Sequence, residues 1–259
     1  MAKQISIEHL GKCAILTHSN PPTNLWTVEG LKELKESLDS LANHPDVRAV
    51  VLTGAGDQYF SAGADLHAFH HADPKSAAFV VGAFAAAFST LRAFPGVTVA
   101  AINGYALGGG LECALACDFL VAERGAKLGF PETKVGLIPC AGGTKLLSDK
   151  VGLSWAKRMI LGGSVLSADE AKNIGLVEEV VDSGFAKIVA ISLANKVGDQ
   201  APNAVASARR LIEESPYNTL LKQMEREREA VLQLAGRDEM EEGIGAFFEK
   251  RAPRWQDES

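Results

Sequence analysis

Two glutamates in this sequence could move protons on a bound ligand. Glu112 follows a run of three glycines, 108–110, in the first turn of an expected helix, although a carboxylate there also stabilises the helix through its dipole. Glu132 follows Pro131 in an expected loop, where an isolated carboxylate is usually just solvated. Both come after core strands and beside glycine-rich backbone, which is where α/β folds place their ligands. Their shared placement indicates a ligand site in which the two carboxylates could act as acid and base.

Two glycine-containing turns could present backbone N–H groups to the same ligand. In residues 60–66 (FSAGADL), Asp65 can cap a following helix, so that the Ala64 amide would point outward; an ordinary strand-to-helix turn is the alternative. Residues 103–112 (NGYALGGGLE) open a helix directly after an apolar strand, and unpaired N–H groups there suit a developing oxyanion. A dinucleotide fingerprint would need glycine at Ala106, and no Walker lysine follows.

The elements that must position these groups alternate between apolar strands and helices. Strands are predicted at 4–10, 13–18, 47–52, 97–102, 119–122 and 127–130. Helices are predicted at 27–42, in a separate segment that ends at Arg92, and around 111–117. The rhythm of strand, glycine-rich loop and helix occurs twice. It predicts stacked β-β-α units in an α/β core, but the pattern alone does not separate them from a doubly wound sheet.

The last part of the chain is predicted to be helical. Beyond Gly143, a capping box at 167–170 and a glycine stop at Gly175 mark one helix. A boundary near 195–202 divides a core of residues 1–197 from a helical region of residues 198–259. That region carries an apolar stripe that needs a partner, either its own core or another subunit. The stripe consists of Leu220, Leu221, Met224, Val231, Leu232, Ile244, Phe247 and Phe248.

Composition argues against several classes of protein. The net charge of −6, with 26 basic and 32 acidic residues, gives no electrostatic footprint for nucleic acid or an anionic membrane. The most apolar window, 77–88, is shorter than the roughly 20 residues that span a bilayer and predicts a buried helix. The N-terminus lacks the apolar run of a secretory signal. The four cysteines are too sparse for a disulfide framework, so we expect reduced thiols and a cytoplasmic location.

Other residues with chemical potential have simpler explanations. His67, His70 and His71 share a predicted helical face and could suggest a metal site, but exposed or ligand-flanking histidines explain them equally well. Cys113 and Cys117 are one turn apart without further ligands nearby in sequence, which favours small core residues. The sequence predicts no metal site.

Several long motifs, in order, resemble the enoyl-CoA hydratase (crotonase) family. The resemblance covers nearly the whole chain and is strongest at 60–66, 102–119, 129–144, 166–181 and 241–253. It implies a crotonase-like spiral of repeated β-β-α units with a C-terminal helical trimerisation region. It also implies a homotrimer or a dimer of trimers, a homohexamer. Fatty acid metabolism, including β-oxidation, is the implied general setting.

The resemblance also implies roles for single residues. The N–H groups of Ala64 and Gly109 would form the oxyanion hole for a thioester carbonyl. Glu112 would act as base toward water and Glu132 would donate the α-proton. The remaining implied contacts to substrate and coenzyme A are Asn24, Leu25, Ala62, Gly63, Asp65, Leu66, Tyr105, Leu107, Gly108, Pro131 and Cys140.

The implied reaction is syn addition of water to a trans-2-enoyl-CoA, giving a 3-hydroxyacyl-CoA. Coenzyme A belongs to the substrate, and no other cofactor is expected. An enoyl-CoA isomerase or another crotonase-type lyase is the alternative, and a catalytically silent scaffold or RNA-binding member is a third. Cys140 stands where many hydratases have glycine and would narrow the pocket; residues 20–25 lack the basic residue often found there. Residues 67–90 are expected to shape the acyl pocket.

Overall fold

The chain is described from a computed structural model over residues 3–44 and 46–255. It divides into two units, Met1–Asn195 and Lys196–Ser259. Helix α6 (Ala186–Gly198) contains the division, which lies two residues before the boundary predicted from sequence.

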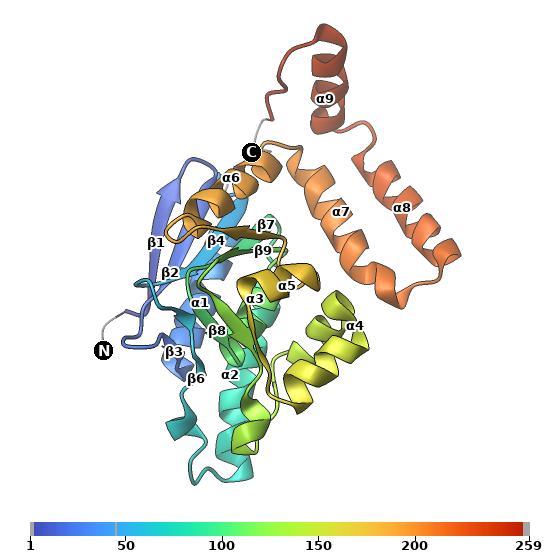
Figure 1. Cartoon of the computed structure of the whole chain (residues 1–259). Coiled ribbons are helices and arrows are strands. Elements are labelled where there is room, and N and C mark those ends of the chain that lie inside the picture. Colours follow the sequence, from blue (N-terminus) through green and yellow to red (C-terminus); the bar gives the residue numbers. More distant parts are fainter. Residues whose placement is uncertain (1–2, 45, 256–259) are drawn as a thin grey trace. The chain divides into compact units, whose positions relative to one another are not determined.

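A six-stranded sheet forms the centre of the first unit (Figure 1). Only β1 and β2 pair antiparallel; every other pair in this sheet is parallel. Every residue of β4 and β7 is buried, as their continuous apolar runs predict for strands covered on both faces. In sheet order, the strands are β1 (Ile5–Leu10), β2 (Cys13–His18), β4 (Ala49–Gly54), β7 (Val97–Ile102), β9 (Phe119–Glu123) and β12 (Glu179–Val181).

The shorter strands belong to two further sheets. A four-stranded sheet has the order β11 (Val165–Ser167), β10 (Lys127–Gly129), β8 (Tyr105–Leu107) and β5 (Tyr59–Ser61). Strands β3 (Leu25–Trp26) and β6 (Gly63–Ala64) pair by themselves. The chain thus leaves the large sheet after β4, β7 and β9 and enters the four-stranded sheet as β5, β8 and β10. A doubly wound fold would keep successive strands in one sheet, so the predicted spiral of β-β-α units is confirmed.

Helices follow these strand pairs and carry the sequence signals expected of them. The Thr27 hydroxyl accepts a hydrogen bond from the Gly30 amide at the start of α1 (Val28–Ala42), and all four leucines of α1 are buried. The other helices of this unit are α2 (Pro74–Arg92), α3 (Gly109–Leu115), α4 (Gly143–Leu161) and α5 (Ala168–Asn173). Two short 3₁₀ helices, η1 (Leu66–Ala68) and η2 (Glu132–Val135), also belong to this unit, and a third, η3 (Ser215–Tyr217), lies in the second unit.

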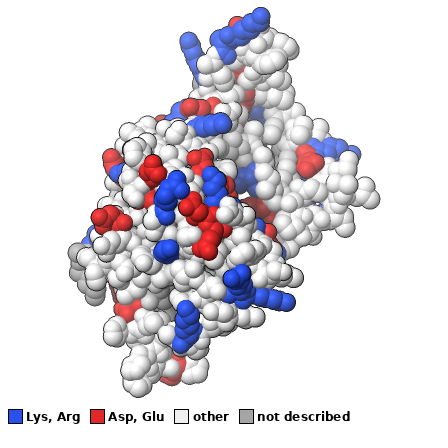
Figure 2. Space-filling view, in the orientation of Figure 1, with Lys and Arg blue, Asp and Glu red and all other residues white. Residues whose placement is uncertain are grey.

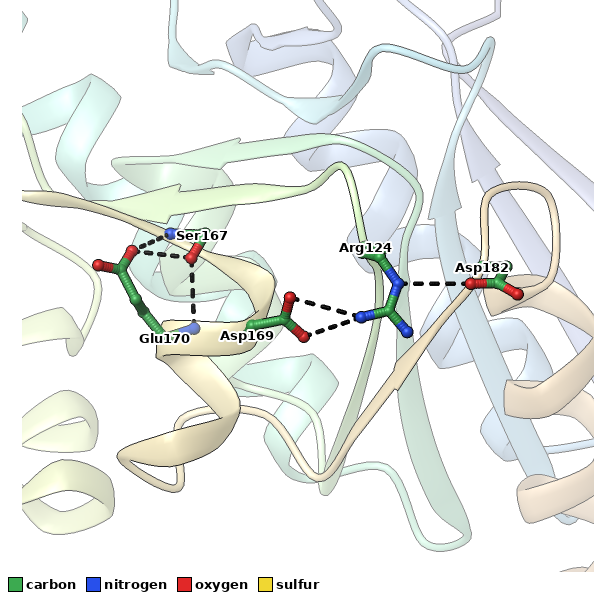
Figure 3. Close-up of polar contacts among 5 residues, drawn as sticks. All are labelled: Arg124, Ser167, Asp169, Glu170 and Asp182. Atoms are coloured by element: carbon green, nitrogen blue, oxygen red, sulfur yellow. Dashed lines mark hydrogen bonds and ion pairs between the residues drawn. The ribbon is translucent and has the colours of Figure 1, made fainter.

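The N-terminus of α5 shows the predicted capping box. The Ser167 hydroxyl accepts from the Glu170 amide, and the Glu170 carboxylate accepts from the Ser167 amide (Figure 3). Beside it, Arg124 pairs with Asp169 at 3.1 Å and with Asp182 at 3.4 Å (Figure 3). Arg124 therefore joins the turn after β9 to α5 and to the end of β12.

Helix α2 differs from the sequence prediction, which took its apolar window for a buried helix. One face packs into the core through Val80, Phe84, Phe88 and Leu91, while Phe79 on another face is 70% exposed. The periodicity of an alanine-rich segment does not show which apolar side chains face the core. Among the described residues, α2 is also the one helix whose length and composition would allow it to cross a membrane.

The second unit contains three longer helices, α7 (Pro202–Glu214), α8 (Leu220–Leu234) and α9 (Asp238–Glu249). The Asn203 amide donates to Glu239 at 3.1 Å, joining α7 to α9. Every member of the predicted apolar stripe is exposed, from 46% for Ile244 to 78% for Phe247. The second unit therefore leaves this stripe uncovered, and its own core is not the partner.

Charged side chains of both signs are interspersed on the face shown in Figure 2. Elsewhere in the described chain, charged side chains are also paired at short range, as in the Lys145–Asp149 pair one turn apart on α4. The mixture agrees with the near-balanced composition of 26 basic and 32 acidic residues. Pairs this exposed contribute on the order of 0–1 kcal/mol each to stability.

Candidate active site

The glycine run before α3 gives this helix an open N-terminus. Gly108 adopts φ 52° and ψ −125°, a conformation that side chains strongly disfavour. Its amide donates to the Gly129 carbonyl at 2.9 Å, and the first helical bond runs from the Glu112 amide to the Gly108 carbonyl. The Gly109 amide precedes that bond and has no acceptor within the helix. The sequence therefore builds a helix start with an outward-facing donor.

The Ala64 amide lies close to the Gly109 amide. A Cβ added to Gly63, whose φ is +102°, would lie 3.3 Å from the Gly109 nitrogen, and a Cβ added to Gly109 would lie 3.6 Å from the Ala64 nitrogen. The Phe84 ring closes the other side, 2.8 Å from the same Gly109 position. Two backbone donors from β6 and α3 therefore meet in a space where no side chain fits.

Glu112 is held rigidly beneath this space. It is 1% exposed, and its Oε1 accepts from the Ala141 amide at 2.7 Å and from the Gly143 amide at 2.8 Å. Burial raises the pKa of Glu112, and hydrogen bonds from the Ala141, Gly143 and Cys140 amides oppose that rise. The amides before and at the start of α4 thus stabilise the ionised form of this buried carboxylate.

Glu132 has the opposite surroundings. A Cβ added to Gly108 would lie 3.0 Å from its Oε1, while its Oε2 is buried with no hydrogen-bond partner in the described part of the chain. Burial, with a smaller contribution from the Glu112 charge, raises the pKa of Glu132 to about 7, against a hydrogen bond from its own amide. This carboxyl is therefore suited to hold a proton near neutral pH.

Both carboxyl groups and both amides line one pocket with a volume of about 880 Å³. This size lies within the range of small-molecule sites. Twelve of the fifteen residues that the sequence singled out line it. They are Leu25, Ala62, Gly63, Ala64, Asp65, Leu66, Gly108, Gly109, Glu112, Pro131, Glu132 and Cys140.

Three residues of the predicted set do not line this pocket. Asn24 is 3% exposed and donates through Nδ2 to the Ala55 and Tyr59 carbonyls at 2.9 and 2.8 Å, so that it fixes the loop before β5. Leu107 lies behind Gly63, with its carbonyl oxygen 2.7 Å from the position of a Gly63 Cβ. Tyr105 lies on a separate cavity.

The structure adds residues that the sequence did not single out. Ala77, Val81 and Phe84 of α2 line the pocket, within the range 67–90 expected to shape the acyl pocket. The segment 134–138 lines it as well and was missed. Its Val135 and Ile138 are 57% and 68% exposed, and apolar residues in a loop directly after Glu132 are a signal that could have indicated a binding surface.

A thiol and an imidazole also belong to the lining of the pocket. Cys140 lines the pocket, and burial, followed by the Glu112 and Glu132 charges, raises the pKa of its thiol to about 12, so the thiol stays protonated. His67 also lines the pocket. Within residues 3–44 and 46–255, no group of three or more His, Cys, Asp or Glu side chains could hold a metal ion.

Comparison with known proteins places this geometry in context. A sequence family described as "Enoyl-CoA hydratase/isomerase" matches residues 11–258. The 2,3-dehydroadipyl-CoA hydratase of Escherichia coli is 36% identical over 86% of each chain. The short-chain-enoyl-CoA hydratase of Clostridium acetobutylicum is 34% identical over 95% of each. The solved structure of Pseudomonas aeruginosa DspI superposes with a TM-score of 0.96 at 45% identity, covering 98% of this chain and 97% of that one.

Proposed function

Because the chain belongs to the enoyl-CoA hydratase/isomerase family, we propose that it adds water to the 2,3 double bond of a 2-enoyl-CoA. The product is a 3-hydroxyacyl-CoA. One observation carries this proposal: two backbone donors and two glutamates with contrasting surroundings line a single pocket. An isomerase moves a proton within its substrate and can use one carboxyl group, whereas hydration removes one proton from water and delivers another to carbon.

The proposed reaction assigns one step to each group. As the water oxygen bonds to C3, Glu112 takes the water proton, and the double-bond electrons move through C2 to the carbonyl oxygen. The Ala64 and Gly109 amides donate to that oxygen, which carries the negative charge of the enolate. Glu132 then gives its proton to C2, and the thioester carbonyl re-forms. By analogy with other oxyanion holes, each donor contributes about 2.7–4 kcal/mol to stabilising the transition state.

The contrast between the glutamates supports this assignment. The base must be ionised, and the Glu112 carboxylate accepts two amide hydrogen bonds. The acid must be protonated, and burial without a partner favours the neutral form of Glu132. Two carboxyl groups whose surroundings separate their pKa values are typical of paired acid and base catalysts. The reaction is proposed to need no cofactor beyond the coenzyme A of the substrate.

The test is loss of the conjugated thioester absorbance when the intact protein is mixed with crotonyl-CoA. Glu112→Gln and Glu132→Gln should each lower the rate by about 100-fold or more. The glutamine side chain that replaces each glutamate keeps the shape of the site. Glu8→Gln, on the exposed edge strand β1, is the matched control and should hydrate normally. Unchanged absorbance with short, medium and long 2-enoyl-CoA substrates would contradict the proposal and favour the isomerase or lyase alternative.

We further propose a homotrimer or a dimer of trimers. The exposed apolar stripe of the second unit supports this, because side chains such as Phe247 and Phe248, 78% and 76% exposed, need a covering surface. Sedimentation velocity of the intact chain tests the assembly, and a monomer at micromolar concentration would contradict it.

The cellular setting is also a proposal. Cys13, Cys113, Cys117 and Cys140 are free thiols, which fits a reducing compartment such as the cytoplasm; a disulfide detected in the native protein by mass spectrometry would contradict this. Turnover of 2-enoyl-CoA fits fatty acid metabolism, including β-oxidation. Normal growth on fatty acids after deletion would count against that setting.

A further inference from the structure

A second cavity lies at the carboxyl ends of the six-stranded sheet. Its volume is about 450 Å³, and it shares no lining residue with the larger pocket. Segments that follow β4, β7, β9 and β12 supply its walls, among them Asp57, Asn103, Gly125 and Ser183. The carboxyl ends of parallel strands are a common place for ligand sites in α/β folds.

The lining of the cavity includes a carboxylate that has no partner among the described residues. Glu123, the last residue of β9, lines the cavity and is 8% exposed. Its carboxylate forms no hydrogen bond or ion pair with the residues that the structure describes. The neighbouring Arg124 pairs with Asp169 and Asp182 (Figure 3), and successive strand residues point to opposite faces. Glu123 therefore presents a carboxylate without a partner in the described residues to this cavity, and a ligand in the cavity could supply donors to it.

Two tyrosines form an aromatic wall beside this carboxylate. Tyr59 and Tyr105 both line the cavity, and their rings stack with centroids 5.3 Å apart and planes inclined by 30°. Their backbone is fixed, because the Tyr105 amide donates to the Gln58 carbonyl at 2.8 Å and Asn103 Nδ2 donates to the Gly56 carbonyl at 2.9 Å. A Cβ at Gly104 would collide with the Gln58 carbonyl. The wall is thus preorganised in the described structure.

The acidic side chains that line the cavity favour a cationic ligand. Asp57 and Glu123 line it, together with no lysine or arginine. The nearest basic residue along the four-stranded sheet is Lys127, the β10 partner of Tyr105, which is absent from the lining and interacts electrostatically with Glu170. A planar cation would meet a carboxylate and a flat aromatic face at once.

We propose that this cavity binds a small molecule bearing a guanidinium group. Glu123 would accept two parallel hydrogen bonds from the guanidinium plane, the geometry that this group forms with carboxylates. The Tyr59 and Tyr105 wall would contact its face by stacking and cation–π attraction, and Asp57 would add negative charge at the rim. The site is independent of the acyl-CoA pocket.

The test compares butylguanidinium with N-butylurea, which has a similar shape and no charge. Isothermal titration calorimetry of the intact protein should show saturable binding of butylguanidinium, and at least tenfold weaker binding of the urea. Glu123→Gln should weaken butylguanidinium binding at least tenfold, and Tyr105→Leu should weaken it several-fold. Glu8→Gln should leave it unchanged, and crotonyl-CoA turnover by Glu123→Gln should match the wild type, which shows that the variant is folded.

Equal binding of the two probes, or undiminished binding by Glu123→Gln, would overturn the proposal. A guanidinium could also come from an arginine of a second copy of the chain. Sedimentation velocity distinguishes this source: a smaller assembly for Glu123→Gln, with no butylguanidinium binding to the wild type, would show that the cavity is part of an interface. That result would likewise overturn the proposal of a small-molecule site.

Discussion

Glu112 and Glu132 line the same pocket, yet they differ in the hydrogen bonds that their carboxyl groups receive. The region around Glu112 supplies two amides within 2.8 Å of a single carboxylate oxygen. The region around Glu132 buries one carboxylate oxygen and gives it no donor in the described chain. Residue type is identical, so the difference in proton affinity comes from the surroundings, chiefly burial and the hydrogen bonds from backbone amides.

Two glycines beside the glutamates contribute to this difference. Each glutamate abuts a glycine: a Cβ at Gly143 would lie 2.9 Å from Glu112 Oε1, and a Cβ at Gly108 would lie 3.0 Å from Glu132 Oε1. These glycines let the backbone approach each carboxyl group closely. Adding one methyl group at either position should therefore disturb one member of the pair at a time.

The largest effect is expected for Gly108→Ala, which should lower kcat of crotonyl-CoA hydration about 1000-fold. Gly108 has φ 52° and ψ −125°, so alanine is strained there by roughly 1–3 kcal/mol. The added methyl group also presses on Glu132, and relaxation of the turn would move the adjacent Gly109 donor. Steady-state kinetics measures the loss.

Gly56→Ala is the strain-matched control for this substitution. Gly56 has φ +81° with open space around its Cβ position and does not line the pocket. It should lower the melting temperature without a comparable loss of kcat. Equal losses of kcat in the two variants would show that general strain, and not the position of Glu132 and Gly109, accounts for the effect.

Gly143→Ala should have the next largest effect, a loss of about 100-fold in kcat, because a misplaced catalytic group costs about that much. The new methyl group would lie 2.8 Å from Pro139 Cβ and 2.9 Å from Glu112 Oε1. The base would then lose alignment with the attacking water. The three atoms nearest to this position belong to Pro139 and Glu112 and not to Glu132, so the alkaline limb of the pH profile should keep its midpoint. A shifted midpoint would mean that the two regions are not separable.

The pH profile tests the comparison directly. Because burial raises the pKa of Glu132 to about 7, this group keeps its proton below that pH and loses it above. Since the proposed donor must be protonated, kcat/KM should fall above about pH 7, by up to about tenfold per pH unit. The raised pKa of Glu112 produces the acidic limb, where the base becomes protonated. An alkaline limb that persists in Glu132→Gln would assign it to another group.

Much of the fold could be predicted because its signals are local. Apolar runs located β4, β7 and β9 within two residues at their starts and ends, and the Ser167–Glu170 capping box is present as predicted. The alternation between two sheets could not be predicted from periodicity, since β5 and β8 have three residues each and lie within glycine-rich loops. The family resemblance supplied that topology.

The candidate site likewise contains residues that local sequence patterns predict and contacts that only the tertiary structure shows. Gly108, Gly109 and Glu112 are contiguous and could be found from sequence, as could Ala64 beside Gly63. Hydrogen bonds from Ala141 and Gly143 to Glu112 span 29 and 31 residues, and no local pattern reveals them. Tyr105 was placed in the substrate site by the resemblance, whereas in the structure it lies on a different cavity. Long-range packing decides such placements.

The smallest effect is expected for Phe84→Leu, which asks whether the wall behind the oxyanion donors belongs to the site. The Phe84 ring lies 2.8 Å from the Gly109 Cβ position, and Phe84 lines the pocket. A smaller side chain would therefore let the Gly109 donor move and should lower kcat/KM about tenfold or less.

Phe88→Leu is the matched control: Phe88 is equally buried, packs edge-on against Phe84 at 5.6 Å and does not line the pocket. Both variants should lose about 1 kcal/mol of unfolding free energy, measured by urea denaturation, but only Phe84→Leu should lose activity. Equal activity in both would limit the site to its two amides and two glutamates.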